Sequence, residues 1–266
     1  FFASHAAALR LTLQVCAVMA WFMAETAPDI TAMNFEDALR ALGCVVESMV
    51  QQPGLADSVF VEDTAIVFDE LAVMTRPGAQ SRRAEVASVA EALGRHRPLR
   101  WMQAPGTLDG GDVLRIGHVV HVGASARSNA EGAEQLRGFV AEHGYSVRRV
   151  PMHDCLHLKS AVTALDDETV LLQPRWVDRG QFADYRIIEV DDTEEHAANV
   201  LRVGDGVLVV GPNRVFLDYI GNVLPSLGER SVQQRTALDL CVPKVPITGI
   251  DTSEQRRHKG SEEMLL

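Results

Sequence analysis

The sequence predicts an α/β protein built from a repeated unit of one β-hairpin and its covering segments. Apolar, strand-forming runs flank a short turn at four places. The turns, at Asp69, Gly117, Asp166 and Asp205, fall 48, 49 and 39 residues apart, and this unequal period is typical of a divergent repeat. Helical spacing of apolar residues recurs between hairpins. One unit is too small to hold a core, so a radial arrangement would bury the units and gather their entrance loops around one axis.

Composition and charge narrow the class of protein. The chain has 266 residues, of which 47% are apolar and 23% charged, ordinary values for a globular protein with a full core. A formal net charge of −11 argues against nucleic acid as a partner, because phosphates would find no matching charge. The four cysteines are widely separated and show neither metal-ligand spacing nor a disulfide framework. A reducing cytoplasm is therefore the expected compartment.

Residues 1–32 are predicted to form a divergent N-terminal segment, and residues 33–266 a single domain. The apolar run at 7–24 contains Arg10 and other polar residues, and it is too short and too polar for a membrane span. We expect a helix that packs on the domain. A secretory signal, with Ala24 before Glu25, is the alternative reading.

The elements follow from local signals. Asn34 is the expected N-cap of a short helix that stops at Gly43, and a strand is expected over Cys44–Glu47. A second helix is expected over Ser81–Leu93, and the Ser128–Glu131 stretch has the spacing of a capping box that opens a helix to His143. The four predicted hairpins pair 65–68 with 71–74, 113–116 with 119–122, 161–165 with 170–172, and 200–203 with 207–210.

Three carboxylates, Asp57, Glu62 and Asp63, crowd the entrance of the first hairpin. On an extended strand, neighbours such as Glu62 and Asp63 point to opposite faces, so one of them must face the interior or a cleft. A buried carboxylate needs a cation or several donors. A site for a cationic ligand is the functional interpretation, and a solvated strand entrance is the alternative.

Other ionisable residues stand at the same phase of the repeat. Asp109 and Asp112 precede the second hairpin and His157 precedes the third, while Arg76 and Arg127 follow hairpins. Taken singly, each has an ordinary explanation: a structural histidine, a turn, or a surface charge. Their repetition at one phase predicts that they converge on a common mouth.

At this point the residues resemble a known family, the dimethylarginine dimethylaminohydrolases, within the guanidine-modifying (pentein) group that includes arginine deiminases and amidinotransferases. Six motifs occur in the family's order: Asp57-Ser58-Val59-Phe60-Val61-Glu62-Asp63, Thr75-Arg76-Pro77-Gly78-Ala79, Leu108-Asp109-Gly110-Gly111-Asp112-Val113, Ser125-Ala126-Arg127-Ser128-Asn129, Leu156-His157-Leu158-Lys159-Ser160 and Asp251-Thr252-Ser253-Glu254. The resemblance implies a five-bladed α/β propeller, with one ββαβ module per blade and the site on the axis.

The resemblance also implies roles for residues of this chain. Asp63 would grip the guanidinium of the substrate, supported by Glu62 and Asp57. Arg76 and Arg127 would fix the amino-acid end of the substrate, and arginine does pair bidentately with carboxylate. His157 would be the general acid and base, oriented by Asp109. Lys159 stands where arginine deiminases carry an aspartate, which favours a methylated arginine as substrate.

The implied chemistry is covalent hydrolysis, through a cysteine thiolate, to citrulline and an alkylamine. No metal or cofactor is implied, the implied partner is a small arginine-like molecule, and a homodimer is the possible assembly. The family's nucleophile lies in a Gly-Gly-x-x-Cys-like segment after the last motif. Residues 259–266 hold no cysteine, and Met264 stands near the expected position, where a thioether cannot form a thiolate.

Three interpretations follow. The first is an amidine hydrolase of the methylarginine type, whose chain ends have diverged, for instance through a shifted reading frame. The second is a non-catalytic relative that binds arginine-like ligands without the nucleophile. The third, an unrelated repeat scaffold, is disfavoured by six ordered motifs. Cys155 and Cys241 are the weaker candidates for a replacement nucleophile.

Overall fold

The structure is a computed structural model, in which residues 39–40, 44–50, 52, 54–55, 57–58, 60–191, 197–203, 206–211 and 232–236 are described. Several predictions from the sequence lie outside these residues. They concern the segment 1–32, the N-cap at Asn34, Cys241, the Asp251-Thr252-Ser253-Glu254 motif and Met264.

Strands of the described residues form four sheets of three strands each. The first sheet is β1 Ala65–Val67, β2 Ala72–Met74 and β3 Leu99–Trp101; the second is β4 Val113–Ile116, β5 Val119–Gly123 and β6 Ser146–Val150; the third is β7 Val162–Ala164, β8 Thr169–Leu172 and β9 Arg186–Glu189; the fourth is β10 Leu201–Val203, β11 Gly206–Gly211 and β12 Val232–Thr236. In each sheet the first two strands are antiparallel and the second and third are parallel. The predicted hairpin repeat is therefore confirmed.

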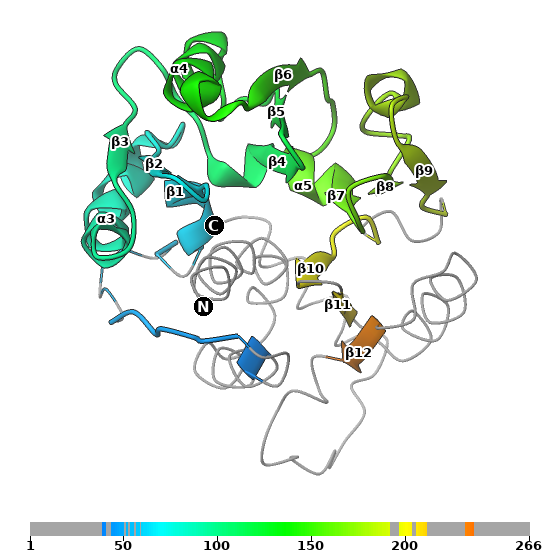
Figure 1. Ribbon diagram of the computed structural model, residues 1–266, viewed down its shortest axis with the longest axis horizontal. Helices are drawn as coiled ribbons and strands as arrows, with labels where there is room; N and C mark the ends of the chain where they lie inside the picture. The colour runs from blue at the N-terminus through cyan, green and yellow to red at the C-terminus, as the bar shows by residue number, and fades with distance from the viewer. Residues whose placement is uncertain are drawn as a thin grey trace, which may run out of the picture.

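The four sheets follow one another along an arc (Figure 1), and the first strand of each lies nearer the middle than the third. Parallel strands cannot be joined by a tight turn, so a longer crossover must connect the second strand to the third. In the first sheet this crossover contains α3 Val86–Gly94, and in the second it contains α4 Ala130–Val140. The repeat is thus an α/β unit, as its sequence pattern predicts.

The predicted helix over Ser81–Leu93 is confirmed in its second half. Its first half is the 3₁₀ helix η2 Gln80–Glu85, and α3 then buries Val86, Val89, Ala90 and Leu93, the i, i+3, i+4, i+7 face expected of an amphipathic helix. The tighter first half has a tertiary cause, because it carries two buried charged side chains of the site described below.

The helix after the second hairpin begins one residue later than the capping-box prediction. Asn129 is the N-cap, and its side chain accepts a hydrogen bond from the Gly132 amide at 2.8 Å. The helix continues as the 3₁₀ turn η4 Ala141–His143 and ends at Gly144, whose φ of +80° suits a residue without a side chain. The Ser128 hydroxyl, predicted to cap, turns instead toward a buried carboxylate.

Neighbouring sheets share their cores. On β4, Val113 packs into one apolar cluster with Val73 of the first sheet, and the next residue, Leu114, packs into another with Val170 of the third sheet. This alternation follows from the two-residue period of a strand. Because both faces of β4 are covered, the loops that enter successive hairpins are held at fixed positions relative to one another.

The strand predicted over Cys44–Glu47 is wrong. Residues 44–50 form no regular structure, and Val45 is 65% exposed. β-forming residues need a neighbouring strand to accept their hydrogen bonds, and the Cys44 amide bonds instead to the Leu39 carbonyl at 3.0 Å. Of the helices that the described residues form, none is long and apolar enough to span a membrane.

Candidate active site

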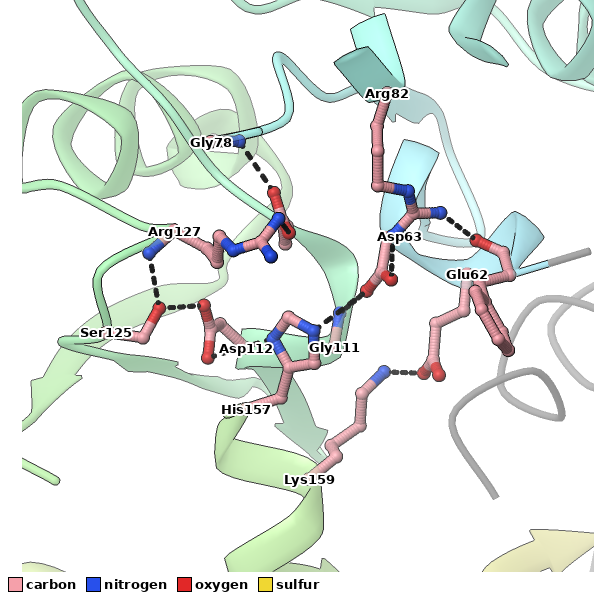
Figure 2. A network of polar contacts seen from close by, with 12 residues as sticks. Glu62, Asp63, Gly78, Arg82, Gly111, Asp112, Ser125, Arg127, His157 and Lys159 are labelled. Atoms are coloured by element: carbon pink, nitrogen blue, oxygen red, sulfur yellow. Dashed lines mark hydrogen bonds and ion pairs between the residues drawn. The ribbon is translucent and has the colours of Figure 1, made fainter. Parts of the chain in front are cut away.

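Three short helical turns, each placed before the first strand of a sheet, meet at one point. These are η1 Val61–Thr64 before β1, η3 Gly110–Asp112 before β4, and α5 Leu158–Ala161 before β7. η1 contacts η3, and η3 contacts α5. Ligand atoms of Asp63, Asp109 and His157 lie within 4.8 Å of one another. The entrance loops therefore converge (Figure 2).

The first entrance loop differs from its predicted conformation. The extended geometry that would send Glu62 and Asp63 to opposite faces is replaced by the turn η1, and both side chains are buried. The Thr64 hydroxyl donates to the Val61 carbonyl at 2.7 Å and so closes this turn. Two carboxylates are therefore buried where the sequence predicted at least one, and each has a cation beside it.

Asp63 is held by Arg82, a residue that the sequence analysis did not select. The Arg82 Nη1 atom donates to Asp63 Oδ2 at 2.5 Å, and its Nε and Nη2 atoms donate to Glu85 Oε2 at 3.1 and 2.9 Å. The same Nη2 atom also donates to the carbonyl oxygens of Asp57 and Phe60. This arginine is buried with its N–H groups directed at oxygen atoms. In the sequence, Arg82 and Glu85 suggest only a surface pair three residues apart.

Burial and neighbouring charges shift the pKa values of Arg82 and Glu85. Burial acts to lower the pKa of Arg82, but the hydrogen bonds and charges of Glu85 and Asp63 outweigh it, so the pKa is raised. Burial raises the pKa of Glu85, although Arg82 opposes that shift. Arg82 therefore stays charged and binds Asp63 through Oδ2. The other oxygen, Asp63 Oδ1, accepts a hydrogen bond from the Gly111 amide at 2.9 Å.

We expect Arg82→Leu to destabilise the fold by about 3–5 kcal/mol, because it leaves two buried carboxylates without their cation. The side chains of Arg82, Asp63 and Glu85 are 6%, 10% and 3% exposed. Arg95→Leu is the matched control, since the Arg95–Glu47 pair is 54% and 52% exposed and should contribute less than about 1 kcal/mol. Urea denaturation measures both, and equal losses in the two variants would contradict this assignment.

Glu62 is neutralised by a residue of the third entrance turn. The Lys159 Nζ atom forms an ion pair with Glu62 Oε1, and both side chains are buried (Figure 2). A buried charge requires such a partner. Lys159 was singled out from the sequence for its place two residues after His157, and the structure adds its counter-ion.

Asp109 is the carboxylate with the least compensation. It is fully buried, and its Oδ1 atom accepts from the Gly78 amide at 2.8 Å. Its Oδ2 atom has no hydrogen-bond partner among the described residues, and the nearest cation is the Arg127 Nη1 atom at 3.9 Å. Burial raises the pKa of Asp109 to about 6, against the Gly78 hydrogen bond, and the negative charges of Asp63 and Asp112 act in the same upward direction.

His157 lies between two carboxylates. Its Nε2 atom is 3.8 Å from Asp63 Oδ1, and its Nδ1 atom is 3.6 Å from Asp112 Oδ1. The carboxylate within 4 Å of Nδ1 is thus that of Asp112, three residues after Asp109, for which the sequence analysis predicted the orienting role. Burial acts to lower the pKa of His157, but Asp112, Asp63 and Asp109 outweigh it, so the pKa is raised. The sequence signal for this contact is the Asp-Gly-Gly-Asp stretch, whose two aspartates lie three residues apart, so that either could have been predicted to face His157.

The two glycines of this stretch make the approach possible. A Cβ atom on Gly110 would lie 2.0 Å from the Glu62 carbonyl oxygen. One on Gly111 would lie 2.8 Å from both Asp63 Oδ1 and the His157 ring. Any side chain here would push η3 away from η1 and α5. The Gly-Gly pair in the motif therefore has a steric reason.

The other residues predicted for the site differ in whether they reach this group of side chains. Arg127 lies beside Asp109 and is one-third exposed, so its guanidinium can also meet solvent. The guanidinium of Arg76 donates to the Gly106 carbonyl at 3.3 Å, a contact outside this group. Asp57 is exposed and contributes its backbone carbonyl to Arg82. The structure thus brings Asp63, Asp109, Arg127 and His157 together.

Two further possibilities concern a thiol and a metal. Burial, together with the charges of Asp112 and Asp154, raises the pKa of Cys155 to about 12, so this thiol stays protonated and is a poor nucleophile near neutral pH. The donors of Asp63, Asp109 and His157 have a spacing that a cation could use. We assign no metal to them, because Arg82 already neutralises Asp63 at 2.5 Å.

Repeated sheets of this kind, with a largely buried histidine among carboxylates at the entrance turns, are what the resemblance to the guanidine-modifying, or pentein, group implies. The arginine deiminase family model matches residues 31–215 of the chain. The chain therefore belongs to the arginine deiminase family and, by its relatives, to the part of it that contains the dimethylarginine dimethylaminohydrolases.

The relatives that carry this assignment include two bacterial enzymes. Dimethylarginine dimethylaminohydrolase of Streptomyces coelicolor is 49% identical over 138 residues, 52% of this chain and 54% of the relative. That of Pseudomonas aeruginosa is 38% identical over 155 residues, 58% of this chain and 61% of the relative. The chain thus matches these curated relatives over between half and two thirds of their length.

Solved structures agree with the fold. A cysteine-to-serine variant of the Pseudomonas aeruginosa enzyme, in complex with citrulline, has a TM-score of 0.72 at 31% identity and covers 79% of this chain and 81% of its own. The N-terminal domain of a cyanobacterial arginine dihydrolase has a TM-score of 0.68 at 16% identity, covering 81% and 83%, and this likeness shows the fold alone.

Proposed function

We propose that the chain binds a methylated arginine through its guanidinium group, in a five-bladed α/β propeller. Two bacterial relatives named for dimethylarginine support the ligand class. The proposed reaction is hydrolysis of the guanidinium C–N bond to citrulline and an alkylamine.

One observation carries the proposal: Asp109 is a fully buried carboxylate whose Oδ2 atom has no hydrogen-bond donor among the described residues. The neighbouring carboxylates are each compensated, Glu62 by Lys159 and Asp63 by Arg82. A buried carboxylate with so little compensation favours a cationic ligand. A guanidinium suits this place because its planar N–H groups pair with carboxylate oxygens, here Asp109 Oδ2 and Asp63 Oδ1.

The other end of the ligand would face Arg127. Its guanidinium lies 3.9 Å from Asp109 and is one-third exposed, so it can bind an α-carboxylate while a cation occupies the interior. Arg76 was expected to share this role from the family resemblance, and its Gly106 contact would have to change for it to do so.

The preference for a methylated guanidinium is inferred from the Lys159–Glu62 pair. A methylated nitrogen carries fewer N–H donors, so it gains little from a further free carboxylate. Lys159 neutralises Glu62 in the buried interior, so Glu62 is not available to the ligand as a further free carboxylate. By family resemblance, arginine deiminases have an aspartate at this place, which suits an unsubstituted guanidinium.

In the family's chemistry a cysteine thiolate attacks the guanidinium carbon, and the alkylamine leaves as the C–N bond breaks. His157, with its raised pKa, would supply the proton to the departing amine. Water then cleaves the thiouronium, releasing citrulline and regenerating the thiol. By family resemblance the thiol would come from a Gly-Gly-x-x-Cys-like segment, and in this chain Met264 stands near the position expected for that cysteine.

A specific observation favours a second function. Residues 259–266 contain no cysteine, and the Cys155 thiol has its pKa raised to about 12. The chain would then be a binder of arginine-like ligands without turnover. Binding of methylarginine is common to both functions, and release of citrulline separates them.

Binding of asymmetric dimethylarginine should strengthen as the pH rises through about 6. The raised pKa of Asp109, about 6, means that its carboxylate becomes available to the cation only above that pH. The raised pKa of His157 acts in the same direction, because protonated imidazole repels a guanidinium. Calorimetric titration from pH 5 to 8 measures this dependence.

Asp109→Asn is the control, since it should remove the step near pH 6 together with most of the affinity. The sign for stability is opposite. The folded-state pKa of Asp109, about 6, exceeds its ordinary 3.8, so the contribution of this group to stability is lost as the pH rises from about 3.8 to about 6 and changes no further above that. Affinity that falls with rising pH, or no binding of methylarginine at any pH, would contradict the proposed function.

A further inference from the structure

We propose that Gly78, in the segment between β2 and η2, is a positioning residue that sets the distance between the two ends of the ligand site. Its backbone contacts both ends: Asp109, the carboxylate proposed for the guanidinium, and Arg127, the arginine proposed for the α-carboxylate. The inference rests on the proposed function for these two roles. Gly78 has no side chain with which to bind a ligand, so it acts through its two neighbours.

Gly78 lies closer to the backbone of Arg127 than any side chain would permit. A Cβ atom at position 78 would be 2.5 Å from both the Arg127 Cα and the Arg127 carbonyl oxygen, whereas ordinary van der Waals contact of a Cβ atom begins at 3.4 Å. These neighbours are main-chain atoms, so they cannot rotate away as the end of a side chain can. Any other residue at position 78 therefore has to separate the two segments.

The same residue is bonded to the other end of the site. The Gly78 amide donates to Asp109 Oδ1 at 2.8 Å (Figure 2). The second oxygen of that carboxylate, Oδ2, lies 3.9 Å from Arg127 Nη1. Gly78 thus contacts Asp109 through its N–H group and Arg127 through its Cα, and the spacing of the two residues depends on both contacts.

Asp109 is the end that stays with Gly78. The Arg76 carbonyl, two residues before Gly78, accepts from the Leu108 amide at 3.0 Å, and Leu108 is the residue before Asp109. Two hydrogen bonds therefore hold these two segments together, on either side of the place where a Cβ atom would be added. The added atom should move Arg127 away from Asp109 and leave Asp109 in place.

Gly78 is required for space and not for its backbone conformation. The φ angle of Gly78 is outside the left-handed region, which Gly54, Gly117 and Gly144 occupy among the described residues. If the space at Gly78 served packing alone, alanine there would lower stability and weaken every ligand alike. If it positions Arg127, alanine should weaken the ligands that carry an α-carboxylate and spare those that do not.

The test is Gly78→Ala, with calorimetry of two ligands. One is asymmetric dimethylarginine, and the other is asymmetrically dimethylated agmatine, which has the same guanidinium and chain but no carboxylate. The variant should bind asymmetric dimethylarginine at least about tenfold more weakly, because a small misplacement of a binding group is costly. It should bind the agmatine within about threefold of the unmodified chain, since alanine keeps the N–H bonded to Asp109. Equal losses for both ligands would overturn the proposal.

Gly117→Ala is the matched control, a glycine-to-alanine change in the turn between β4 and β5. The φ of Gly117 is +55°, so alanine there is strained, but no described residue beyond the chain neighbours lies within 4 Å of its Cβ position. Urea denaturation should show a loss of stability, while the ratio of the two affinities stays unchanged. A change of this ratio as large as in Gly78→Ala would contradict the assignment, because the ratio would then follow stability.

A ligand-free measurement separates this proposal from the proposed function. The ¹⁵N NMR signal of the Arg127 Nε atom, identified by its loss in Arg127→Lys, should shift in Gly78→Ala and stay in place in Gly117→Ala. An unshifted signal overturns the positioning role, whereas an unmodified chain that binds neither ligand overturns the proposed function. If Gly78→Ala does not fold, the unmodified chain is titrated with dimethylarginine homologues one methylene shorter and longer. A fixed spacing predicts at least about tenfold weaker binding of both, and equal binding of all three lengths would refute it.

Discussion

Placing a Gly-Gly-x-x-Cys sequence over residues 260–264 is expected to raise citrulline release from asymmetric dimethylarginine by several orders of magnitude. Loss of a covalent nucleophile in a comparable hydrolase removes roughly 10⁶-fold of the rate, so the unmodified chain should release citrulline at background. His157 and its carboxylates can polarise a guanidinium, but they cannot divide its hydrolysis into two easier steps. The measurement is a citrulline assay, with mass spectrometry for an adduct on the new cysteine.

Two variants serve as controls for the graft. Met264→Cys alone should restore little, because Ser261 and its acidic neighbours stand where the family's loop needs glycine to approach the substrate. The graft combined with His157→Gln should return to background, since the departing amine then lacks its proton. Citrulline release by the unmodified chain at an enzyme-like rate, with an adduct on Cys155 or Cys241, would refute this view of the nucleophile.

Asp63→Asn is expected to weaken methylarginine binding by roughly 30-fold to several thousand-fold, about 2–5 kcal/mol. Asp63 Oδ1 faces His157 at 3.8 Å, where the guanidinium would lie, while Oδ2 remains engaged by Arg82. The variant removes one member of a desolvated charge pair with the ligand. Calorimetry of the folded variant measures the loss, with circular dichroism to verify that it is folded.

Asp69→Asn is the matched control for this change. Asp69 is also an aspartate beside an arginine, 3.6 Å from Arg115, but it is half exposed and stands at the turn between β1 and β2. Its replacement should change the affinity by less than about threefold, or ~0.65 kcal/mol. If Asp63→Asn also stays within that limit, the ligand binds elsewhere.

Much of the fold could be predicted because its signals are local. Strand-forming runs around the turns at Asp69, Gly117, Asp166 and Asp205 specify hairpins within a few residues of chain, and all four hairpins form. The run at Cys44–Glu47 also contains strand-forming valines and forms no strand, because a strand also needs a partner that the composition does not supply.

The sequence by itself determined which entrance loops carry ionisable residues, and so placed Asp63, Asp109 and His157 in one site. Only the tertiary structure decided how these residues are paired. Arg82 reaches Asp63 across 19 residues, Lys159 reaches Glu62 across 97, and Asp112 rather than Asp109 faces His157 Nδ1. Such pairings depend on the register of packed sheets and on the close approach that Gly110 and Gly111 allow, and neither is encoded in a local pattern.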